Sequence, residues 1–358
     1  MRTSKAGLAV LAAAAAALTV AAPAAAKTRV VTPGHSIQKA IDKSKPGDTV
    51  LVREGRYAQS LQITTDDITL RGEEGAVLTQ PSKVADTVCN SLFAEGPGKQ
   101  TGICVVGDVG PGPHGGPPEV TREVTHVRIA GFTIHNFGSV GITIFGGKKT
   151  LVKRNRLAEN GGYGVFANTS RGTRFIGNIA HNNHEAGFYV GDSPNANAVV
   201  HDNVSIGNGN GIFLRNAEGG NISGNTVRNN CVGVLVLGDA PGPSGNWTIA
   251  DNTATRNNKA CAGSADNPAV SGMGIAVLSA NDTKVVNNRV SGNVHRHKSF
   301  ASGGIVVGKS GPTPPTHDLI QGNVLTDNAP FDIKWDKSGT VTFRSNECER
   351  SSPGGLCH

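Results

Sequence analysis

The chain has 358 residues, with 34 Lys and Arg against 27 Asp and Glu, which gives a formal net charge of +7. Glycine contributes 48 residues, about twice its usual share, whereas aromatic residues make up only 4%. Hydrophobic residues account for 37% of the chain, which excludes a transmembrane transporter or a large helical bundle. Intrinsic disorder is also excluded, because short runs of Val, Ile and Leu recur along the whole length.

Residues 1–26 have the pattern of an export signal. Arg2 and Lys5 form a charged start, an Ala-rich apolar run follows, and small residues continue to Ala26. We expect cleavage after Ala26 and a secreted, extracellular protein. An uncleaved membrane anchor is disfavoured, because the strongly apolar part is short for a bilayer span. Cleavage would leave 32 basic and 27 acidic residues, or +5. That charge slightly favours acidic polymers but lacks the basic stripe of a nucleic-acid-binding protein.

The mature chain opens with a short amphipathic helix. Ser36 is the expected N-cap of a helix that runs to Ile41, and we expect this helix to cover the N-terminal end of the core. A Pro-Gly-Asp turn over residues 46–48 then leads into a first strand over Thr49–Val52.

A short strand that opens with glycine repeats through the rest of the chain. In the first four steps between these glycines the spacing is 22 to 24 residues. The second and fourth residues of each run are aliphatic or Phe with little exception, from Ile142 and Ile144 to Ile305 and Val307. Because side chains alternate along a strand, these residues share one face, which we predict to be the interior. The repeated glycines are Gly141, Gly164, Gly187, Gly211, Gly233, Gly274 and Gly304.

Asparagine recurs in phase with these strands, in two series five residues apart. We expect these residues at sharp corners, in a left-handed backbone conformation, with their amides stacked into hydrogen-bonded ladders. The first series is Asn155, Asn178, Asn203, Asn225, Asn252, Asn288, Asn323 and Asn346. The second series is Asn160, Asn183, Asn208, Asn230, Asn257, Asn293 and Asn328.

A repeat of about 23 residues with short strands and tight corners is typical of a parallel β-helix. The leucine-rich repeat shares the period, but its leucine framework and helical segments are missing. Coils about 4.8 Å apart would stack as about ten turns of a rod. We therefore predict an all-β fold, a single parallel β-helix domain over residues 27–358 with a short N-terminal capping helix.

Six cysteines in an exported chain predict disulfides. The simplest connectivity joins sequence neighbours, which gives Cys89–Cys104, Cys231–Cys261 and Cys348–Cys357. Cys231 and Cys261 lie at the same corner of adjacent coils, so this pair has the strongest positional support. It would pin the loop 258–273 as a wall beside the sheet. The Gly- and Pro-rich segment 89–119 is expected to be an irregular insertion.

The opening sequence KPGDTVLVREGRYAQSLQI, the later ITLRG, and the coil pattern from Val127 to Asn346 resemble exported right-handed parallel β-helix proteins of the pectin-lyase-like superfamily. The resemblance covers essentially the whole mature chain and implies a right-handed winding. It does not select a function, because the superfamily includes polysaccharide lyases, glycoside hydrolases, epimerases, adhesins and maturation proteins.

The outward positions of the repeated strands carry the candidate site. Phe166, Tyr189 and Phe213 occupy equivalent positions on three successive coils, so we expect them on one outer wall. A row of aromatic faces can bind pyranose rings. The alternative, equally supported by the sequence, is that loops of the protein cover this row and make it a secondary core.

Polar residues follow these aromatics at the strand ends. Arg215 could neutralise a uronate carboxylate, and Tyr189 or His184 could act as the base. Asp192 could orient a group or hold Ca²⁺, the one candidate cofactor. Asn168, Asp239, Phe166 and Phe213 would contact substrate, although a turn-forming role is the favoured alternative for Asp239 and, by a smaller margin, for Asp192.

We therefore expect a protein that acts on, or binds, an acidic polysaccharide, with lyase or epimerase chemistry. The alternative is a non-catalytic glycan-binding or structural scaffold. The resemblance does not decide between these two alternatives. Pectate lyases of the superfamily carry several clustered acidic residues, which this chain lacks on the expected face. Alginate epimerases carry the motif DPHD, whereas this chain has the sequence GFYVGDSP at a comparable strand end. The loop histidines, including those at 295 and 297, are expected to be solvated, and no metal site is predicted. No nucleic-acid or membrane partner is expected, and we expect a monomer.

Overall fold

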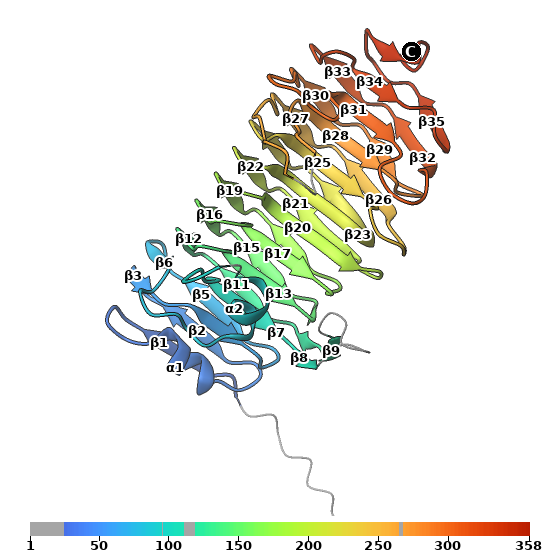
Figure 1. Cartoon of the computed structure of the whole chain (residues 1–358). Helices are drawn as coiled ribbons and strands as arrows, with labels where there is room; N and C mark the ends of the chain where they lie inside the picture. The colour runs from blue at the N-terminus through green and yellow to red at the C-terminus, as the bar shows by residue number, and fades with distance from the viewer. Residues whose placement is uncertain (1–24, 95, 111–118, 265–267) are drawn as a thin grey trace, which may run out of the picture.

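A computed structural model describes residues 25–94, 96–110, 119–264 and 268–358. The chain winds into a rod whose coils run from the N-terminal end to the C terminus at the opposite end (Figure 1). Each coil contributes strands to three long sheets, and within each sheet neighbouring strands are parallel. The predicted parallel β-helix is therefore confirmed. The expected signal peptide over residues 1–26 lies, apart from its last two residues, outside the described residues.

Sheet A forms one side of the rod. Its strands are β1 (Thr28–Val31), β2 (Thr49–Val52), β5 (Thr69–Gly72), β11 (Arg128–Ala130), β15 (Leu151–Lys153), β18 (Arg174–Ile176), β21 (Ala198–His201), the second half of β23 (Asn210–Ser223), β26 (Gly245–Ala250), β29 (Lys284–Val286), β32 (Thr316–Gln321) and β35 (Thr340–Arg344).

Sheet B has ten strands among the described residues, in agreement with the predicted coil number. They are β3 (Gly55–Ala58), β6 (Ala76–Thr79), β12 (Thr133–His135), β16 (Arg156–Ala158), β19 (Ile179–His181), β22 (Val204–Ile206), β24 (Thr226–Arg228), β27 (Thr253–Thr255), β30 (Arg289–Ser291) and β33 (Val324–Thr326).

Sheet C carries the candidate site. Its strands are β4 (Leu61–Ile63), β7 (Ile103–Val106), β13 (Ile142–Phe145), β17 (Val165–Asn168), β20 (Ala186–Ser193), the first half of β23, β25 (Val232–Leu237), β28 (Met273–Leu278), β31 (Gly303–Gly308), β34 (Ile333–Trp335) and β36 (Ser351–Ser352). Two small pairs lie outside these sheets: parallel β10 (Val124–Thr125) with β14 (Gly147–Lys148), and antiparallel β8 (Asp108–Gly110) with β9 (Glu119–Arg122).

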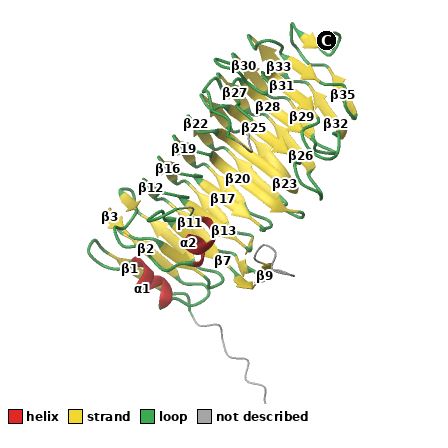
Figure 2. Cartoon of the chain, in the orientation of Figure 1, coloured by secondary structure: helices red, strands yellow, loops and turns green. Residues whose placement is uncertain are grey.

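The predicted capping helix is confirmed as α1 (Ile37–Asp42) at the N-terminal end (Figure 2). The Ser36 side chain accepts a hydrogen bond from the backbone N–H of Lys39, and Ile37 and Ile41 are buried against the core. The expectation that Thr49–Val52 is the first strand was wrong, because β1 precedes it and pairs with it. Within the described residues, no helix is long and apolar enough to span a membrane.

The segment expected to be an irregular insertion is partly regular. It contains most of α2 (Val88–Phe93), which has Thr87 as its N-cap and lies against β7, and β7 itself is a full member of sheet C. Cys104 lies on β7 and forms the predicted disulfide with Cys89. The structure also forms the predicted pairs Cys231–Cys261 and Cys348–Cys357.

The interior of the rod is the apolar stack predicted from the alternating residues. Ile142 and Ile144 of β13 are fully buried, as are Ile305 and Val307 six strands further along sheet C. Each inward residue packs on its equivalent in the next coil, so the core is continuous along the rod. The alternate residues of the same strands face outward, and on sheet C these outward residues include the candidate site.

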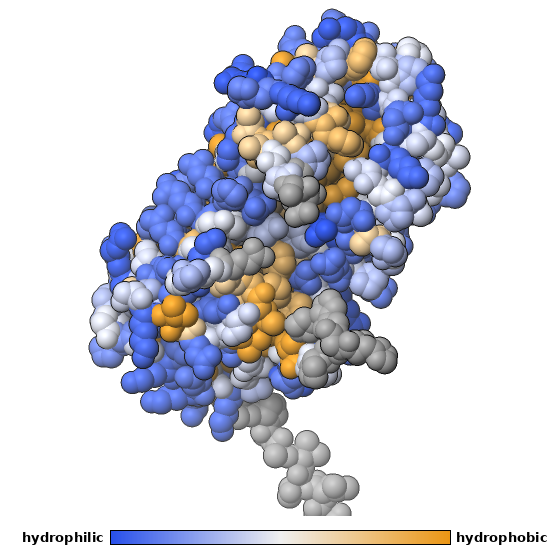
Figure 3. Space-filling view, viewed as in Figure 1, coloured by the Kyte–Doolittle hydropathy of each residue, from blue (hydrophilic) through white to orange (hydrophobic). Residues whose placement is uncertain are grey.

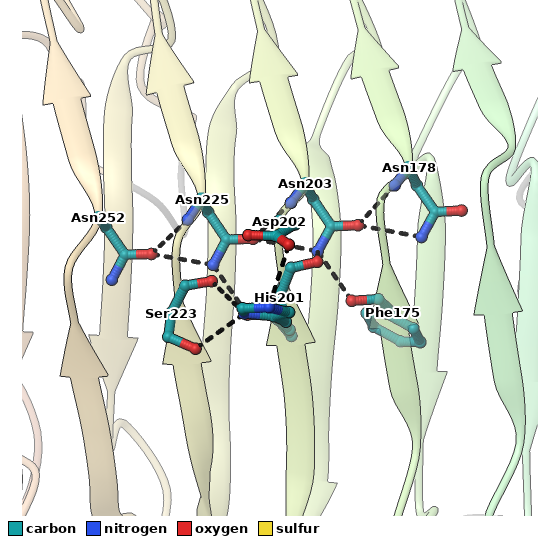
Figure 4. Close-up of polar contacts among 9 residues, drawn as sticks. Phe175, Asn178, His201, Asp202, Asn203, Ser223, Asn225 and Asn252 are labelled. Atoms are coloured by element: carbon teal, nitrogen blue, oxygen red, sulfur yellow. Dashed lines mark hydrogen bonds and ion pairs between the residues drawn. The ribbon is translucent and has the colours of Figure 1, made fainter.

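The two asparagine ladders are confirmed, and Figure 4 shows part of the first. The backbone N–H and Nδ2 of Asn178 donate to Oδ1 of Asn203 at 2.9 and 3.0 Å, and Asn203 donates in the same way to Asn225. Nδ2 of Asn203 also donates to the carbonyl of Phe175 at 2.8 Å. The ladder thus satisfies buried polar groups at the corners that its asparagines occupy.

The expected left-handed conformation of the ladder asparagines was wrong. The positive φ belongs instead to the residue just before each of them, for example Asp202 with φ 54° before Asn203, or Gly177 with φ 63° before Asn178. The preceding residue makes the bend, and the asparagine then points inward, where its amide can bond with the next coil.

Candidate functional site

Strand register places the predicted residues on the outer face of sheet C. Phe166 of β17 lies beside Tyr189 of β20, and Tyr189 lies beside Phe213 of β23. Two residues further along the same strands, Asn168, Gly191 and Arg215 form a parallel row. Because the alternate residues of these strands are in the core, both rows point outward as predicted.

The aromatic row is covered by the protein itself. Only 9% of Phe166 and 2% of Tyr189 is exposed. Their rings are stacked with centroids 4.7 Å apart, Phe93 from α2 lies 5.3 Å from Phe166, and Tyr163 lies 5.0 and 5.1 Å from the two rings. Phe213 contacts Tyr189 edge-on at 5.3 Å and remains partly exposed.

The expected open platform for sugar stacking is therefore wrong for Phe166 and Tyr189, and the alternative of a secondary core describes them. An apolar row on a flat sheet is stabilised when neighbouring segments exclude water from it, and α2 and Tyr163 do so here. Apolar surface still gathers along the middle of the face that carries α2 (Figure 3). Phe213 is the aromatic of the row that keeps an exposed edge.

Tyr189 is held as a neutral phenol. Its ring lies along the strand over Gly191, where an added Cβ would fall 2.1 Å from the tyrosine oxygen, so glycine at this position makes room for the hydroxyl. Burial raises the pKa of Tyr189 well above its ordinary value, and the charge of Asp192 raises it further, against an opposing contribution from Arg215. Tyr189 therefore keeps its proton more tightly than an ordinary tyrosine, which disfavours its predicted role as a base. Its hydroxyl can give up this proton only to a strongly basic atom, such as a departing alkoxide oxygen.

Arg215 is fixed by an ion pair with the next coil. Its Nε donates to both carboxylate oxygens of Asp239, at 3.0 and 2.9 Å. Asn216 holds Asp239 in turn: its Nδ2 donates to Oδ1 at 2.8 Å, and its Oδ1 accepts from the backbone N–H groups of Asp239 and Ala240. Burial lowers the pKa of Arg215, but the hydrogen bond and charge of Asp239 outweigh this effect and raise it. Asp239 is thus a positioning residue and not only a turn former.

Asp192 extends the row on the other side. Its Oδ2 accepts a hydrogen bond of 2.7 Å from Nδ2 of Asn168, whose own oxygen accepts from the hydroxyl of Thr169. Asp192 is exposed and has a left-handed backbone with φ 45°. Such a conformation is unfavourable for a residue with a Cβ, although aspartate tolerates it better than most. The sheet therefore brings Asn168, Tyr189, Asp192, Arg215 and Asp239 to one edge.

His184 does not join this group. It lies just before β20, at the opposite edge of the sheet, and eight residues of extended chain separate it from Asp192 by about 26 Å. Its side chain is 77% exposed, and its Nδ1 lies 3.3 Å from Oε1 of Glu185. This position separates His184 from the other predicted catalytic residues, and its catalytic role stays a prediction.

Calcium does not fit the residues at this edge. Ca²⁺ takes six to eight oxygen ligands, usually with several carboxylates. Asp239 is engaged by Arg215, which leaves Asp192 as the available carboxylate. Within the described ranges, no three His, Cys, Asp or Glu side chains are grouped as a metal site.

Sequence reasoning missed the residues that support the site. Phe93 and Tyr163 cover the aromatic row, and Asn216 orients Asp239; only the position of Asn216 beside Arg215 could have drawn attention to it. A cavity of about 920 Å³ lies elsewhere, at the N-terminal end, between the start of α1 and the residues before α2. It includes none of the predicted site residues.

Residues 90–246 match the family described as the right handed beta helix region. This part of the chain is a right-handed β-helix. The expected resemblance to pectin-lyase-like β-helix proteins is confirmed for the fold. No curated protein matches the sequence.

Solved structures with this fold include enzymes that act on carbohydrates. The A-module of Azotobacter vinelandii mannuronan C-5 epimerase AlgE4 is 16% identical, with a TM-score of 0.54, over 88% of this chain and 90% of that one. DFA-IIIase from Arthrobacter chlorophenolicus A6, solved with GF2, is 13% identical, with a TM-score of 0.54 and the same coverages of 88% and 90%. At sequence identities of 13% and 16%, the similarity establishes the fold alone.

Proposed function

We propose that this β-helix protein binds an acidic polysaccharide at the edge of sheet C and acts on it by proton transfer. The observation that supports this proposal best is the convergence of Tyr189, Asp192 and Arg215 from two neighbouring strands, with a neutral acid, a carboxylate and a cation side by side. Proton abstraction next to a uronate carboxylate requires these three kinds of group.

Each residue has a defined task in this proposal. Arg215, oriented by Asp239, contacts the carboxylate of the sugar and stabilises the charge that develops there. Asp192 accepts the proton from the carbon next to that carboxylate. Tyr189 donates its proton to the glycosidic oxygen when the carbon–oxygen bond breaks and a carbon–carbon double bond forms. In an epimerase, Tyr189 would instead return a proton to the opposite face of the same carbon.

Export is part of the proposal. Three disulfides are typical of proteins that fold in an oxidising compartment. The sequence at residues 1–26 supports secretion through its charged start and apolar run. A secreted protein would meet extracellular polysaccharides directly.

A non-catalytic glycan-binding scaffold is the second candidate. The observation in its favour is the covered aromatic row, which leaves the partly exposed Phe213 beside Arg215 to contact a sugar. Such a protein would bind the same polymer and release no product.

The test is incubation of the mature protein with a panel of polyuronates. Absorbance of unsaturated products reports a lyase, and proton NMR of the recovered polymer reports an epimerase. We expect Tyr189→Phe and Asp192→Asn to lower turnover by at least about 100-fold while binding persists. Arg215→Ala should weaken both polysaccharide binding and turnover. Turnover that is unchanged in all three variants would refute the assignment of the site, and binding without turnover in the wild type would select the scaffold.

A further inference from the structure

A basic cavity lies near the C-terminal end of sheet C, away from the proposed catalytic edge. It has a volume of about 530 Å³ and is bounded by residues 295–302 of the loop between β30 and β31, and by Lys334 of β34. Arg296, Lys298 and Lys334 contribute three cations to its lining, and His295 and His297 lie beside them. Its lining includes no Asp or Glu.

These cations are available to a ligand. In the described part of the chain, none of the ion pairs involves Arg296, Lys298 or Lys334. The proposed catalytic edge has the opposite formal charge, because Arg215 is flanked by two carboxylates, Asp239 and Asp192, and the sum over the three side chains is −1. The counter-charge for an acidic polymer is therefore concentrated in the loop and not at the catalytic edge.

The loop is held in place by its neighbours. The backbone N–H of Phe300 donates to the carbonyl of Ala269 at 2.8 Å, and that of Arg296 donates to the hydroxyl of Ser271 at 3.2 Å. Ala269 and Ser271 belong to the loop that the Cys231–Cys261 disulfide pins. Binding would not have to order the loop, which lowers its entropic cost.

An exposed aromatic side chain lies beside the cations and indicates that an acidic ligand bound there carries a sugar ring. Phe300 is 52% exposed, although a large apolar side chain is usually covered. A sugar ring can stack on such a face while its acidic substituent meets the neighbouring cations. Lys334 follows Val306 in the same outward row as Phe213, four strands further on, or about 19 Å away.

We propose that Arg296, Lys298, Lys334 and Phe300 form a second sugar-binding site for carboxylate- or sulfate-bearing residues of a polysaccharide. The assignment of a polysaccharide rests on the proposed function, whereas anion binding rests on the loop alone. The site anchors an acidic chain at a distance from the catalytic edge, so its loss affects affinity and not the chemical step.

The test is calorimetric titration of the mature protein with a polyuronate, a sulfated polysaccharide, a neutral glucan and single-stranded DNA. The variants are Arg296→Ala with Lys298→Ala, and Phe300→Ala; the matched control is Lys284→Ala, an exposed lysine of sheet A. We expect the double variant to weaken binding of at least one acidic polysaccharide by about 10- to 25-fold, to reduce the salt dependence of its affinity, and to leave neutral glucan unchanged. Phe300→Ala should weaken sugar binding by about fivefold or more.

The outcomes separate the two proposals. If the wild type binds acidic polysaccharide and the loop variants bind equally well, the second site is refuted and the proposed function stands. If the loop variants lose affinity while Arg215→Ala changes neither binding nor turnover, the second site stands and the catalytic assignment fails. Tighter binding of DNA than of either acidic polysaccharide, or no binding of any acidic polymer, would refute the assignment of the second site to sugars.

Discussion

Asp318 places a carboxyl group inside the rod. It lies on β32, faces inward like Ile320, and is only 1% exposed. Its Oδ1 accepts a hydrogen bond of 2.8 Å from the backbone N–H of Thr283, but its Oδ2 is buried with no hydrogen-bond partner. Burial raises the pKa of Asp318 from 3.8 to about 7, and the charge of Asp282 adds to this effect against the opposing Thr283 N–H.

A raised pKa in the folded state makes stability depend on pH. The folded protein keeps the Asp318 proton between about pH 4 and pH 7, where the unfolded chain has lost it. The stabilisation by the protonated Asp318 is fully present below the pKa of the unfolded chain, 3.8, and it is lost as pH rises through the pKa of the folded protein, about 7. The difference between 3.8 and about 7 corresponds to about 4 kcal/mol of unfolding free energy.

Asp318→Asn tests this reasoning because the amide has the same shape and stays neutral. The variant and the wild type should unfold with similar free energies near about pH 4, and the variant should be more stable by up to about 4 kcal/mol at about pH 8. The assay is urea denaturation across this range, followed by circular dichroism. Asp327→Asn, at an exposed turn, is the control and should change stability by less than about 0.5 kcal/mol. A difference between variant and wild type that does not vary with pH would show that the buried carboxyl is ionised throughout.

Two further predictions concern the scaffold. Asn203→Ala removes an amide that accepts from Asn178 and donates to Phe175 and Asn225, so it should lower the unfolding free energy by about 3–5 kcal/mol. Asn221→Ala, on an outward position of β23, should cost less than about 0.5 kcal/mol, and equal urea midpoints for the two variants would contradict the ladder's role. Replacing both members of the Cys231–Cys261 disulfide, which spans 30 residues, by serine should lower the unfolding free energy by about 3–4 kcal/mol; a wild type that denatures identically with and without reductant would argue against it.

The repeating features of this protein could be read from its sequence. The inward pairs such as Ile142 and Ile144, the two asparagine series and the Ser36 helix cap depend on neighbours that are close along the chain or one full coil away. A period of about 23 residues repeats each contact many times, so it is visible in the sequence. The same periodicity placed Tyr189, Phe213 and Arg215 on one outer wall.

What the sequence could not decide is what lies over that wall. Phe93 belongs to α2, far from Phe166 along the chain and outside the repeat, so no spacing predicts that it covers the aromatic row. The pairing of Arg215 with Asp239 and the distance of His184 from both depend on where strands of different lengths end. Burial and ion pairing are properties of the assembled coils, and they determine which of the predicted residues meet and which protonation state Tyr189 keeps.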